Sequence, residues 1–252
     1  YKSLKNQLLD NNIILAPGCY DAFSAMLISN AGFEAAYLTG ASISYTRLGR
    51  PDIGLVSMTE VSNTINLIKE RTNIPLIVDG DTGFGNALNV IRTVKVFEMA
   101  GANAIQLEDQ TLPKRCGHLK GKSLVPTSEM VGKIKAAVDT RKSNDFLIIA
   151  RTDSIAVEGF DSAIARAEQY MHAGADILFI EAPEDERQQK EIPKIFKNKI
   201  PLLANMVEGG STPIKDASEL ESIGYSIVIF PGGLIRAFTH MALEYFDSLK
   251  KH

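Results

Sequence analysis

The feature of this sequence that most restricts its fold is a repeated alternation of short apolar runs with longer amphipathic segments. Eight runs are apolar nearly throughout, which is typical of parallel strands that are buried on both faces. Eight strands alternating with helices in about 250 residues predict an α/β fold of the (β/α)8 TIM-barrel type. The runs span Ile13–Ala16, Ala35–Leu38, Leu76–Val78, Ala104–Leu107, Phe146–Ala150, Ile177–Ile180, Leu202–Ala204 and Ile227–Phe230.

Helical patterns separate these runs, and one more follows the last run. Several of them end at a glycine, which is preferred there because it tolerates positive φ. An open doubly wound sheet is less favoured, since no G-x-G-x-x-G opens the first helix. We therefore expect residues 1–252 to form a single barrel domain. The expected helices are Ala22–Asn30, Thr59–Arg71, Leu88–Ala100, Ser128–Thr140, Asp161–Ala173, Glu186–Phe196, Ala217–Ile223 and Leu234–Lys250.

The composition of the chain restricts the kinds of molecule that we expect it to bind and the compartment in which we expect it. The net charge of −3 argues against nucleic acid, whose binding calls for clustered Lys and Arg and a basic pI. No run of about 18 apolar residues occurs, so we expect no membrane span. The first residues lack the apolar stretch of a signal peptide. Two cysteines without a secretion signal favour a cytoplasmic protein with free thiols.

Polar residues follow the apolar runs at the end where a barrel enzyme carries its active site. Asp79 and Asp81 follow the third run and Glu108 follows the fourth. Three carboxylates this close repel one another unless a cation neutralises them, and Mg²⁺ prefers such oxygen ligands. The alternative is that each carboxylate only caps the next helix. Thr39, Gly40, Arg151, Glu181, Asn205 and Pro231 follow other runs.

A long connection from Gln110 to Pro126 carries the segment Lys114-Arg115-Cys116-Gly117-His118. Cationic neighbours lower the pKa of a cysteine because they favour the thiolate. Such a thiol exchanges a proton with a carbanion or attacks as a nucleophile, and an exposed loop cysteine in a basic patch is the third interpretation. Tyr37 lies inside the second run, where a core role is the default and its hydroxyl could point into the site.

Three motifs resemble the isocitrate lyase/phosphoenolpyruvate mutase superfamily. The likeness runs through essentially the whole chain, and the third motif is specific to the carbon–carbon lyase branch. The resemblance implies a barrel whose last helix swaps onto a neighbouring subunit, in a homotetramer built as a dimer of dimers. It implies Mg²⁺ as cofactor, with Mn²⁺ as an alternative, and a small-molecule carboxylate substrate. The motifs are Asp79-Gly80-Asp81-Thr82-Gly83, Glu108-Asp109-Gln110 and Lys114-Arg115-Cys116-Gly117-His118.

The resemblance also implies which residues bind the metal and the substrate. Asp79 and Asp81 would hold the metal directly or through water, with Asp52 and Glu108 in the surrounding shell. Backbone and hydroxyl donors after the second strand would hold the substrate carboxylate. The substrate-binding residues would be Thr39, Gly40, Ala41, Gly117, Arg151, Glu181, Asn205 and Pro231.

The implied chemistry is cleavage of a carbon–carbon bond in a 2-hydroxy acid. A base takes the hydroxyl proton, and the bond breaks to give a 2-oxo acid such as pyruvate and an enediolate. Cys116 would protonate the enediolate and Arg151 would stabilise its charge. Lys114 and His118 would tune the thiol or bind substrate. Tyr37 or a metal-linked hydroxyl would be the base.

Two features bear on the substrate. The segment Glu208-Gly209-Gly210-Ser211-Thr212-Pro213, together with Pro113, resembles the group that contains dimethylmalate lyases and oxaloacetate hydrolases. Pro231 resembles the lyases, because the hydrolases place a serine there. We therefore favour a lyase acting on 2,3-dimethylmalate or 2-methylisocitrate. An oxaloacetate hydrolase or decarboxylase ranks second and a carboxyphosphonoenolpyruvate-type phosphonomutase third. A barrel that binds a dicarboxylate without catalysis is the remaining alternative.

Overall fold

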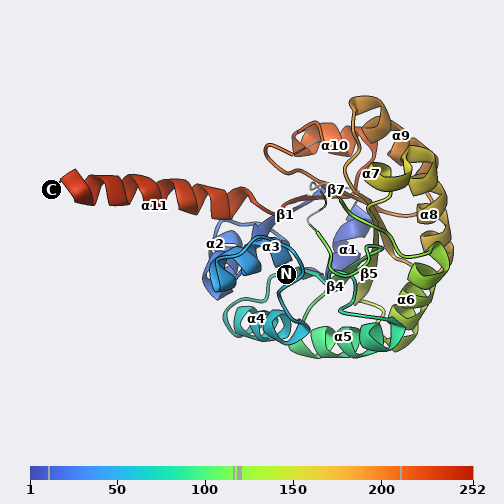
Figure 1. The fold of residues 1–252 in the computed structure, drawn as a ribbon, viewed down its shortest axis with the longest axis horizontal. Coiled ribbons are helices and arrows are strands. Elements are labelled where there is room, and N and C mark those ends of the chain that lie inside the picture. Colours follow the sequence, from blue (N-terminus) through green and yellow to red (C-terminus); the bar gives the residue numbers. More distant parts are fainter. Residues whose placement is uncertain (11, 116, 118–120, 211, 252) are drawn as a thin grey trace.

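The computed structural model describes residues 1–10, 12–115, 117, 121–210 and 212–251. Eight parallel strands close into a barrel in the order of the sequence, and the last strand pairs with the first. Helices form a ring around the strands (Figure 1). The predicted (β/α)8 barrel is therefore confirmed. The strands are β1 (Ile14–Cys19), β2 (Ala36–Leu38), β3 (Leu76–Asp79), β4 (Ala104–Glu108), β5 (Leu147–Thr152), β6 (Ile177–Ile180), β7 (Leu202–Asn205) and β8 (Ile227–Phe230).

The predicted long helices are all present, and short helical turns join them. Most of the outer helices begin at a side-chain cap: Asp21, for example, accepts a hydrogen bond from the Ser24 backbone amide and starts α2. The helical elements are α1 (Leu4–Gln7), η1 (Leu8–Asp10), α2 (Ala22–Asn30), α3 (Gly40–Ile43), η2 (Ser44–Leu48), α4 (Met58–Arg71), α5 (Ala87–Ala100), α6 (Thr127–Thr140), α7 (Ile155–Glu158), α8 (Phe160–His172), α9 (Glu186–Phe196), α10 (Ala217–Ile223) and α11 (Gly233–Lys251).

Two apolar cores hold the barrel together. One lies between the strands and the outer helices and includes Val78, Phe97 and Ile148. The other fills the barrel interior with inward-facing residues such as Ile77 and Ile149. Since neighbouring residues of a strand point to opposite faces, each strand supplies both cores, which is why the runs are apolar throughout.

The short helix α1 closes the barrel at the end where the strands begin. Leu4 of α1 is fully buried in the interior core together with Ile14, Ala104 and Ile227. The Gln7 side chain donates hydrogen bonds to the carbonyl oxygens of Lys2 and Glu34 and fixes the helix there. In Figure 1, α1 lies behind the strands at the centre of the ring. The opposite end, where the strands terminate, is where the polar residues gather.

Several predicted strands end too early. Four strands extend by one or two residues to include Asp79, Glu108, the pair Arg151–Thr152 and Asn205. The first strand continues through Pro17 and Gly18 to Cys19, although Pro and Gly ordinarily interrupt a strand. The charged residues expected just beyond the strands are therefore partly their last residues. Pairing with the neighbouring strand holds them in place more firmly than a loop would.

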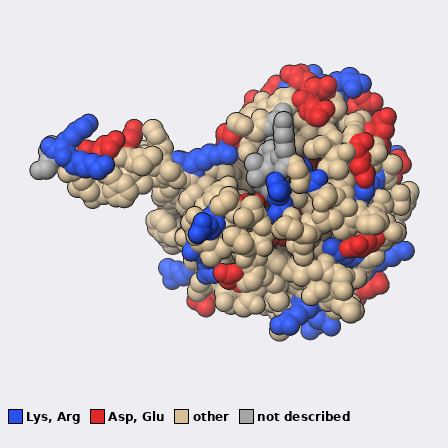
Figure 2. All heavy atoms as spheres, in the orientation of Figure 1, with Lys and Arg blue, Asp and Glu red and all other residues tan. Residues whose placement is uncertain are grey.

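Helix α11 leaves the barrel and projects outward over most of its length (Figure 1). Its apolar side chains Met241, Leu243, Tyr245 and Phe246 are exposed. Across the described residues, no helix combines the length and the apolar character that crossing a membrane requires. On the face that Figure 2 shows, basic and acidic side chains are interspersed over the barrel.

Candidate active site

The inward-facing side chains change from apolar to charged toward the ends of the strands. On β4 the inward residues are Ala104, Gln106 and Glu108, and on β5 they are Ile149 and then Arg151, which pairs with Glu108 in the strand register. Alternation along a strand places every second side chain inside. Charged groups from different strands therefore meet at one end of the barrel.

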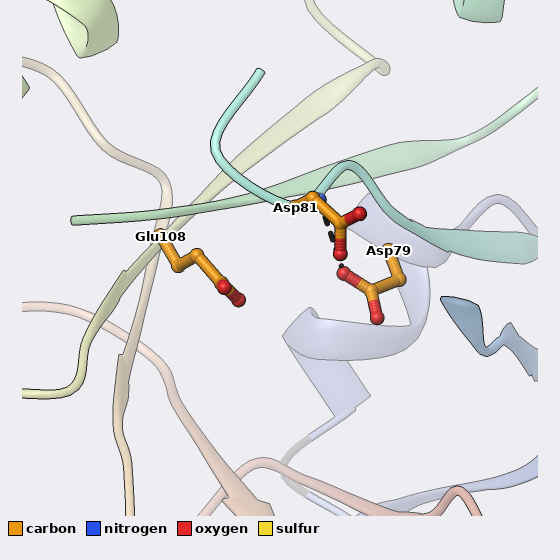
Figure 3. A group of neighbouring side chains, drawn as sticks. All are labelled: Asp79, Asp81 and Glu108. Carbon is orange, nitrogen blue, oxygen red and sulfur yellow. Dashed lines mark hydrogen bonds between the residues drawn. The ribbon is translucent and has the colours of Figure 1, made fainter. Parts of the chain in front are cut away.

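Asp79, Asp81 and Glu108 form the predicted acidic cluster. One oxygen from each lies within 4.8 Å of the others, and all three side chains are buried. Figure 3 shows their carboxylates directed toward a common space between β3, β4 and the loop after β3. The Asp81 backbone amide donates to Asp79 Oδ1 at 3.1 Å, which ties the loop to the strand end. None of the three caps a helix among those described, so the capping interpretation is wrong.

Lys114 inserts its ammonium into this acidic cluster. Its Nζ lies 2.7 Å from Asp52 Oδ1 and 2.5 Å from Asp81 Oδ1, and its side chain is almost completely buried. Burial disfavours the ammonium, but the charges of Asp81, Asp79 and Glu108 outweigh it and raise the pKa of Lys114 well above its usual range. The Lys114 ammonium therefore supplies part of the positive charge that we expected from a metal ion.

The acidic cluster is also chemically suited to a divalent cation. Burial raises the pKa of Asp81 to about 7 and that of Glu108 well above its usual range. Glu108 Oε1 is buried and accepts no hydrogen bond. Excess buried negative charge and an unpartnered carboxylate oxygen are what a bound cation would relieve. Hard oxygen ligands fit Mg²⁺ or Mn²⁺ better than Zn²⁺.

Arg151 lies next to the acidic cluster and is held from several sides. Its Nε and Nη2 donate to both oxygens of Asp153, at 3.0 and 2.9 Å, and its Nη1 lies 3.4 Å from Glu108 Oε2. The guanidinium lies 5.0 Å above the centre of the Phe179 ring. Burial opposes the charge, but Asp153, Glu108 and Glu181 raise the pKa of Arg151 well above its usual range. Arg151 is a fixed, permanent positive charge.

Gly117 packs directly on Arg151. A Cβ at this position would lie 2.2 Å from Glu181 Oε1 and 2.4 Å from Arg151 Nη2. Its carbonyl oxygen accepts a hydrogen bond from the Lys122 ammonium, which also lies 3.1 Å from Asp153 Oδ1. The Gly117 backbone is therefore packed against the charged residues of the rim.

The remaining predicted substrate contacts, except Gly40, line the same small cavity of about 50 Å³. The Asn205 amide donates to both oxygens of Glu181, at 3.1 and 3.3 Å. The Gly40 amide donates to Asp79 Oδ2 at 3.3 Å, and the Thr39 hydroxyl caps α3, so these groups already have partners. The cavity is lined by Tyr37, Thr39, Ala41, Asp52, Asp79, Glu108, Lys114, Arg115, Gly117, Arg151, Glu181, Asn205, Val207, Ile229 and Pro231.

Tyr37, a candidate base, is fully enclosed beneath the acidic cluster. Its hydroxyl donates to Gln106 Oε1 at 2.5 Å. Burial and the charge of Asp79 raise the pKa of Tyr37 well above its usual range. Its hydroxyl therefore keeps its proton in this arrangement. Cys116 and His118 lie outside the described residues, while Cys19 is buried, and burial raises the pKa of its thiol to about 12.

Three polar residues of the site were not singled out from the sequence. Gln106 lies inside the barrel under the acids, Asp153 holds Arg151, and Lys122 joins Gly117 to Asp153. The polar Gln106 in the middle of an apolar run was the available signal. Asp153 follows Arg151 by two residues on the same strand end, and Lys122 was visible only as a charge in a basic loop.

Known proteins are similar to this chain over nearly its whole length. Residues 4–250 match the family model described as phosphoenolpyruvate phosphomutase. The 2,3-dimethylmalate lyase of Eubacterium barkeri is 48% identical over 98% of this chain and 85% of its own length. The 2-methylisocitrate lyase of Aeropyrum pernix is 47% identical over 93% of this chain and 74% of its own length.

Solved structures of similar proteins have the same fold. A 2,3-dimethylmalate lyase superposes with a TM-score of 0.93 at 37% identity, covering 99% of this chain and 84% of that one. An oxaloacetate acetylhydrolase bound to 3,3-difluorooxalacetate gives 0.95 at 33% identity, with 99% and 86% covered. A phosphonopyruvate hydrolase in complex with oxalate and Mg²⁺ gives 0.88 at 32% identity, with the same coverage.

Proposed function

Since this chain belongs to the phosphoenolpyruvate phosphomutase family and is a carbon–carbon lyase, we propose that its substrate is a small 2-hydroxy di- or tricarboxylate. 2,3-Dimethylmalate and 2-methylisocitrate are the two candidates, and each would release pyruvate. The observation that carries this proposal is that Asp79 and Glu108 of the acidic cluster line the same cavity as the fixed cation Arg151. A metal-binding group and an anion-binding group side by side suit a substrate with a hydroxyl and more than one carboxylate.

The proposed cofactor is Mg²⁺, with Mn²⁺ as a substitute. Asp79, Asp81 and Glu108 would hold it, and Asp52 would support the site through Lys114. A bound divalent ion would polarise the substrate's 2-oxygen and carboxylate as a Lewis acid. The crystal structure of the phosphonopyruvate hydrolase with oxalate and Mg²⁺ supports this choice by analogy.

The proposed reaction begins with removal of the 2-hydroxyl proton. The oxygen's electron pair then forms the carbonyl of a 2-oxo acid, and the electrons of the broken carbon–carbon bond remain on the second fragment as an enediolate. Arg151 lies where it can stabilise that charge, and it needs no reorganisation because Asp153 and Glu108 hold it. The Cys116 thiol then donates a proton to the enediolate carbon.

Around this centre the other rim residues would bind the substrate. Thr39 and Ala41 lie on one side of the cavity, and the Glu181–Asn205 pair and Pro231 lie on others. We propose that Gly117 covers the substrate from the side of the long connection. Lys114 would keep the acids partly neutralised, and His118 would act on the Cys116 thiol or on the substrate.

Hydrolysis of oxaloacetate is the second candidate function. It is favoured by the oxaloacetate acetylhydrolase structure, which superposes with a TM-score of 0.95. Pro231 lies on the cavity wall and offers no hydroxyl to a hydrated carbonyl. For this reason we rank the lyase reaction first.

Activity assays on a substrate panel test the proposal. Purified protein with Mg²⁺ is incubated with each acid, and pyruvate is measured with a coupled lactate dehydrogenase, while oxalate and acetate from oxaloacetate are measured by NMR. We expect pyruvate from 2,3-dimethylmalate or 2-methylisocitrate, loss of activity with EDTA, and loss of most activity in Cys116→Ser. Oxalate and acetate without pyruvate would identify the hydrolase instead. A phosphonate substrate turned over by the Cys116→Ser variant would identify a phosphonomutase.

We also propose that copies of this chain associate through α11 into a homotetramer. The exposed apolar residues Met241, Leu243, Tyr245 and Phe246 would be covered by a neighbouring copy. Light scattering after size-exclusion chromatography tests this. A mass near 27.5 kDa at micromolar concentration would contradict it.

A further inference from the structure

The floor of the site contains a polar side chain in an otherwise apolar part of the barrel. Gln106 points inward from β4, between the apolar interior layers and the acidic cluster, and it is fully buried. It pairs in the strand register with Ile149 of the apolar interior core. Burying an amide costs free energy unless its donors and acceptor are hydrogen-bonded. Its presence there calls for an explanation in terms of its partners.

Each hydrogen-bonding group of the Gln106 amide has a specific partner. Oε1 accepts from the Tyr37 hydroxyl at 2.5 Å. Nε2 donates to Asp79 Oδ1 at 3.2 Å and lies 3.3 Å from Glu108 Oε2 as a second acceptor. The reversed amide would place its oxygen against two carboxylates, which repel it. The charges of Asp79 and Glu108 therefore fix which way the amide points, and the Tyr37 hydroxyl completes the arrangement.

These contacts distinguish the two oxygens of Glu108, whereas both oxygens of Asp79 accept hydrogen bonds, Oδ2 from the Gly40 amide at 3.3 Å. The Gln106 amide occupies one oxygen of Asp79 and one of Glu108. Glu108 Oε1 remains buried and without a hydrogen-bond partner. Because both donors come from one planar nitrogen, the two carboxylates are held at a set separation and rotation. The amide also does this without adding charge, whereas a carboxylate at this position would be a fourth acid in the cluster.

From this geometry we infer that Gln106, braced by Tyr37, is a positioning residue that orients Asp79 and Glu108 toward a bound divalent cation. Tyr37 then serves as the support of Gln106 and not as the base of the reaction, because its hydroxyl proton is directed at an amide oxygen, which does not accept a proton. The inference rests on the metal site of the proposed function. Gln106 and Tyr37 would thus support the metal ligands, and neither residue belongs to the three sequence motifs.

The test measures metal binding separately from turnover. Mn²⁺ affinity is determined by electron paramagnetic resonance for the wild type, Gln106→Met and Tyr37→Phe, with kcat and KM measured separately. Gln106→Met keeps the length of the side chain and removes its hydrogen bonds. We expect it to weaken Mn²⁺ binding about 10–100-fold, the range for residues that orient metal ligands. Tyr37→Phe keeps the amide in contact with both acids, so we expect it to weaken Mn²⁺ binding less than Gln106→Met does.

Gln7→Met is the matched control. Gln7 is also a buried glutamine with two hydrogen bonds, but it lies on α1 at the far end of the barrel. We expect it to lower the midpoint of urea unfolding and leave Mn²⁺ affinity unchanged. Folded Gln106→Met with wild-type Mn²⁺ affinity would refute the inference.

If Gln106→Met does not fold, the Tyr37→Phe variant tests the inference in its place. Turnover by Tyr37→Phe reduced more than 10³-fold with unchanged Mn²⁺ affinity would restore Tyr37 as the base and overturn the inference. If the wild-type protein binds no Mn²⁺, the metal site of the proposed function is refuted. If the wild type binds Mn²⁺ and the variants bind it equally well, only the inference about Gln106 is refuted.

Discussion

Replacing Gly117 by alanine is the sharpest steric test of the site. The added Cβ would lie 2.2 Å from Glu181 Oε1 and 2.4 Å from Arg151 Nη2, and real Cβ atoms essentially never approach within 3.0 Å. Neither neighbour moves freely, because Asn205 holds Glu181 and Asp153 holds Arg151.

The magnitude follows from the displacement. Restoring contact distance requires a shift of about 1 Å, by either the Gly117 backbone or the charged groups beneath it. A misplacement of about 1 Å at a reacting centre costs roughly 100-fold in rate. That factor corresponds to about 2.7 kcal/mol of transition-state stabilisation. We expect this loss mainly in kcat, since the proposed substrate contacts on Thr39 and Pro231, which also line the cavity, would remain.

The assay is pyruvate release under steady-state conditions, with the thermal midpoint of unfolding measured in parallel. Gly132→Ala is the control: Gly132 lies inside α6, and a Cβ there meets nothing within 4 Å. Alanine in a helix interior should stabilise the fold by up to about 1 kcal/mol and leave activity unchanged. A Gly117→Ala enzyme with kcat/KM within threefold of wild type would refute the packing argument.

Three other predictions concern the metal and the buried charges. Asp79→Asn should weaken Mn²⁺ binding at least roughly 100-fold, as measured by electron paramagnetic resonance, because it removes a charged ligand; unchanged affinity would place the ion elsewhere. In the metal-free protein burial raises the pKa of Asp81 to about 7, so this carboxyl holds a proton below that pH and binding must release it. Mn²⁺ affinity should therefore rise by up to about tenfold per pH unit between pH 5 and 7 and level off above, and a flat profile by isothermal titration calorimetry would contradict this. Arg166→Met leaves the buried carboxylate of Asp109 without its cation, which should lower the free energy of unfolding by about 3–5 kcal/mol. In urea denaturation the exposed Arg92→Met should change it by no more than about 0.5 kcal/mol, and equal effects of the two variants would show that the buried pair contributes nothing.

The fold could be predicted from the sequence because burial on both faces leaves a simple signal. All eight apolar runs overlap observed strands, from Ile14–Cys19 to Ile227–Phe230. The ends were predicted less well, since Asp79 and Arg151 look like loop residues by polarity alone. Their charge faces a polar cavity inside the barrel, so it does not oppose strand pairing. The short helix α1 has too few residues to produce a periodic pattern.

The candidate site was predictable in part. Carboxylates after successive runs indicated the acidic cluster, and the structure brings Asp79, Asp81 and Glu108 together. The ion pair between Lys114 and Asp52 was not predictable, because the two residues are far apart along the chain although Lys114 Nζ lies 2.7 Å from Asp52 Oδ1. The same holds for Gln106 and Tyr37, whose hydrogen bond joins strands that are 69 residues apart. Motifs record neighbours along the chain, whereas these contacts depend on barrel closure.

Helix α1 closes one end of the barrel and so restricts the paths by which substrate can enter and products can leave. With Leu4 filling the interior at the end where the strands begin, the described part of the barrel opens at the other end, where Gly117 packs against Arg151 and Glu181. The substrate enters and both fragments leave by the same opening. On the proposed mechanism, the fragment held by the acidic cluster would lie deeper than the one beside Gly117. We therefore expect sequential release, with the outer acid leaving first and the inner acid acting as a competitive inhibitor of the forward reaction.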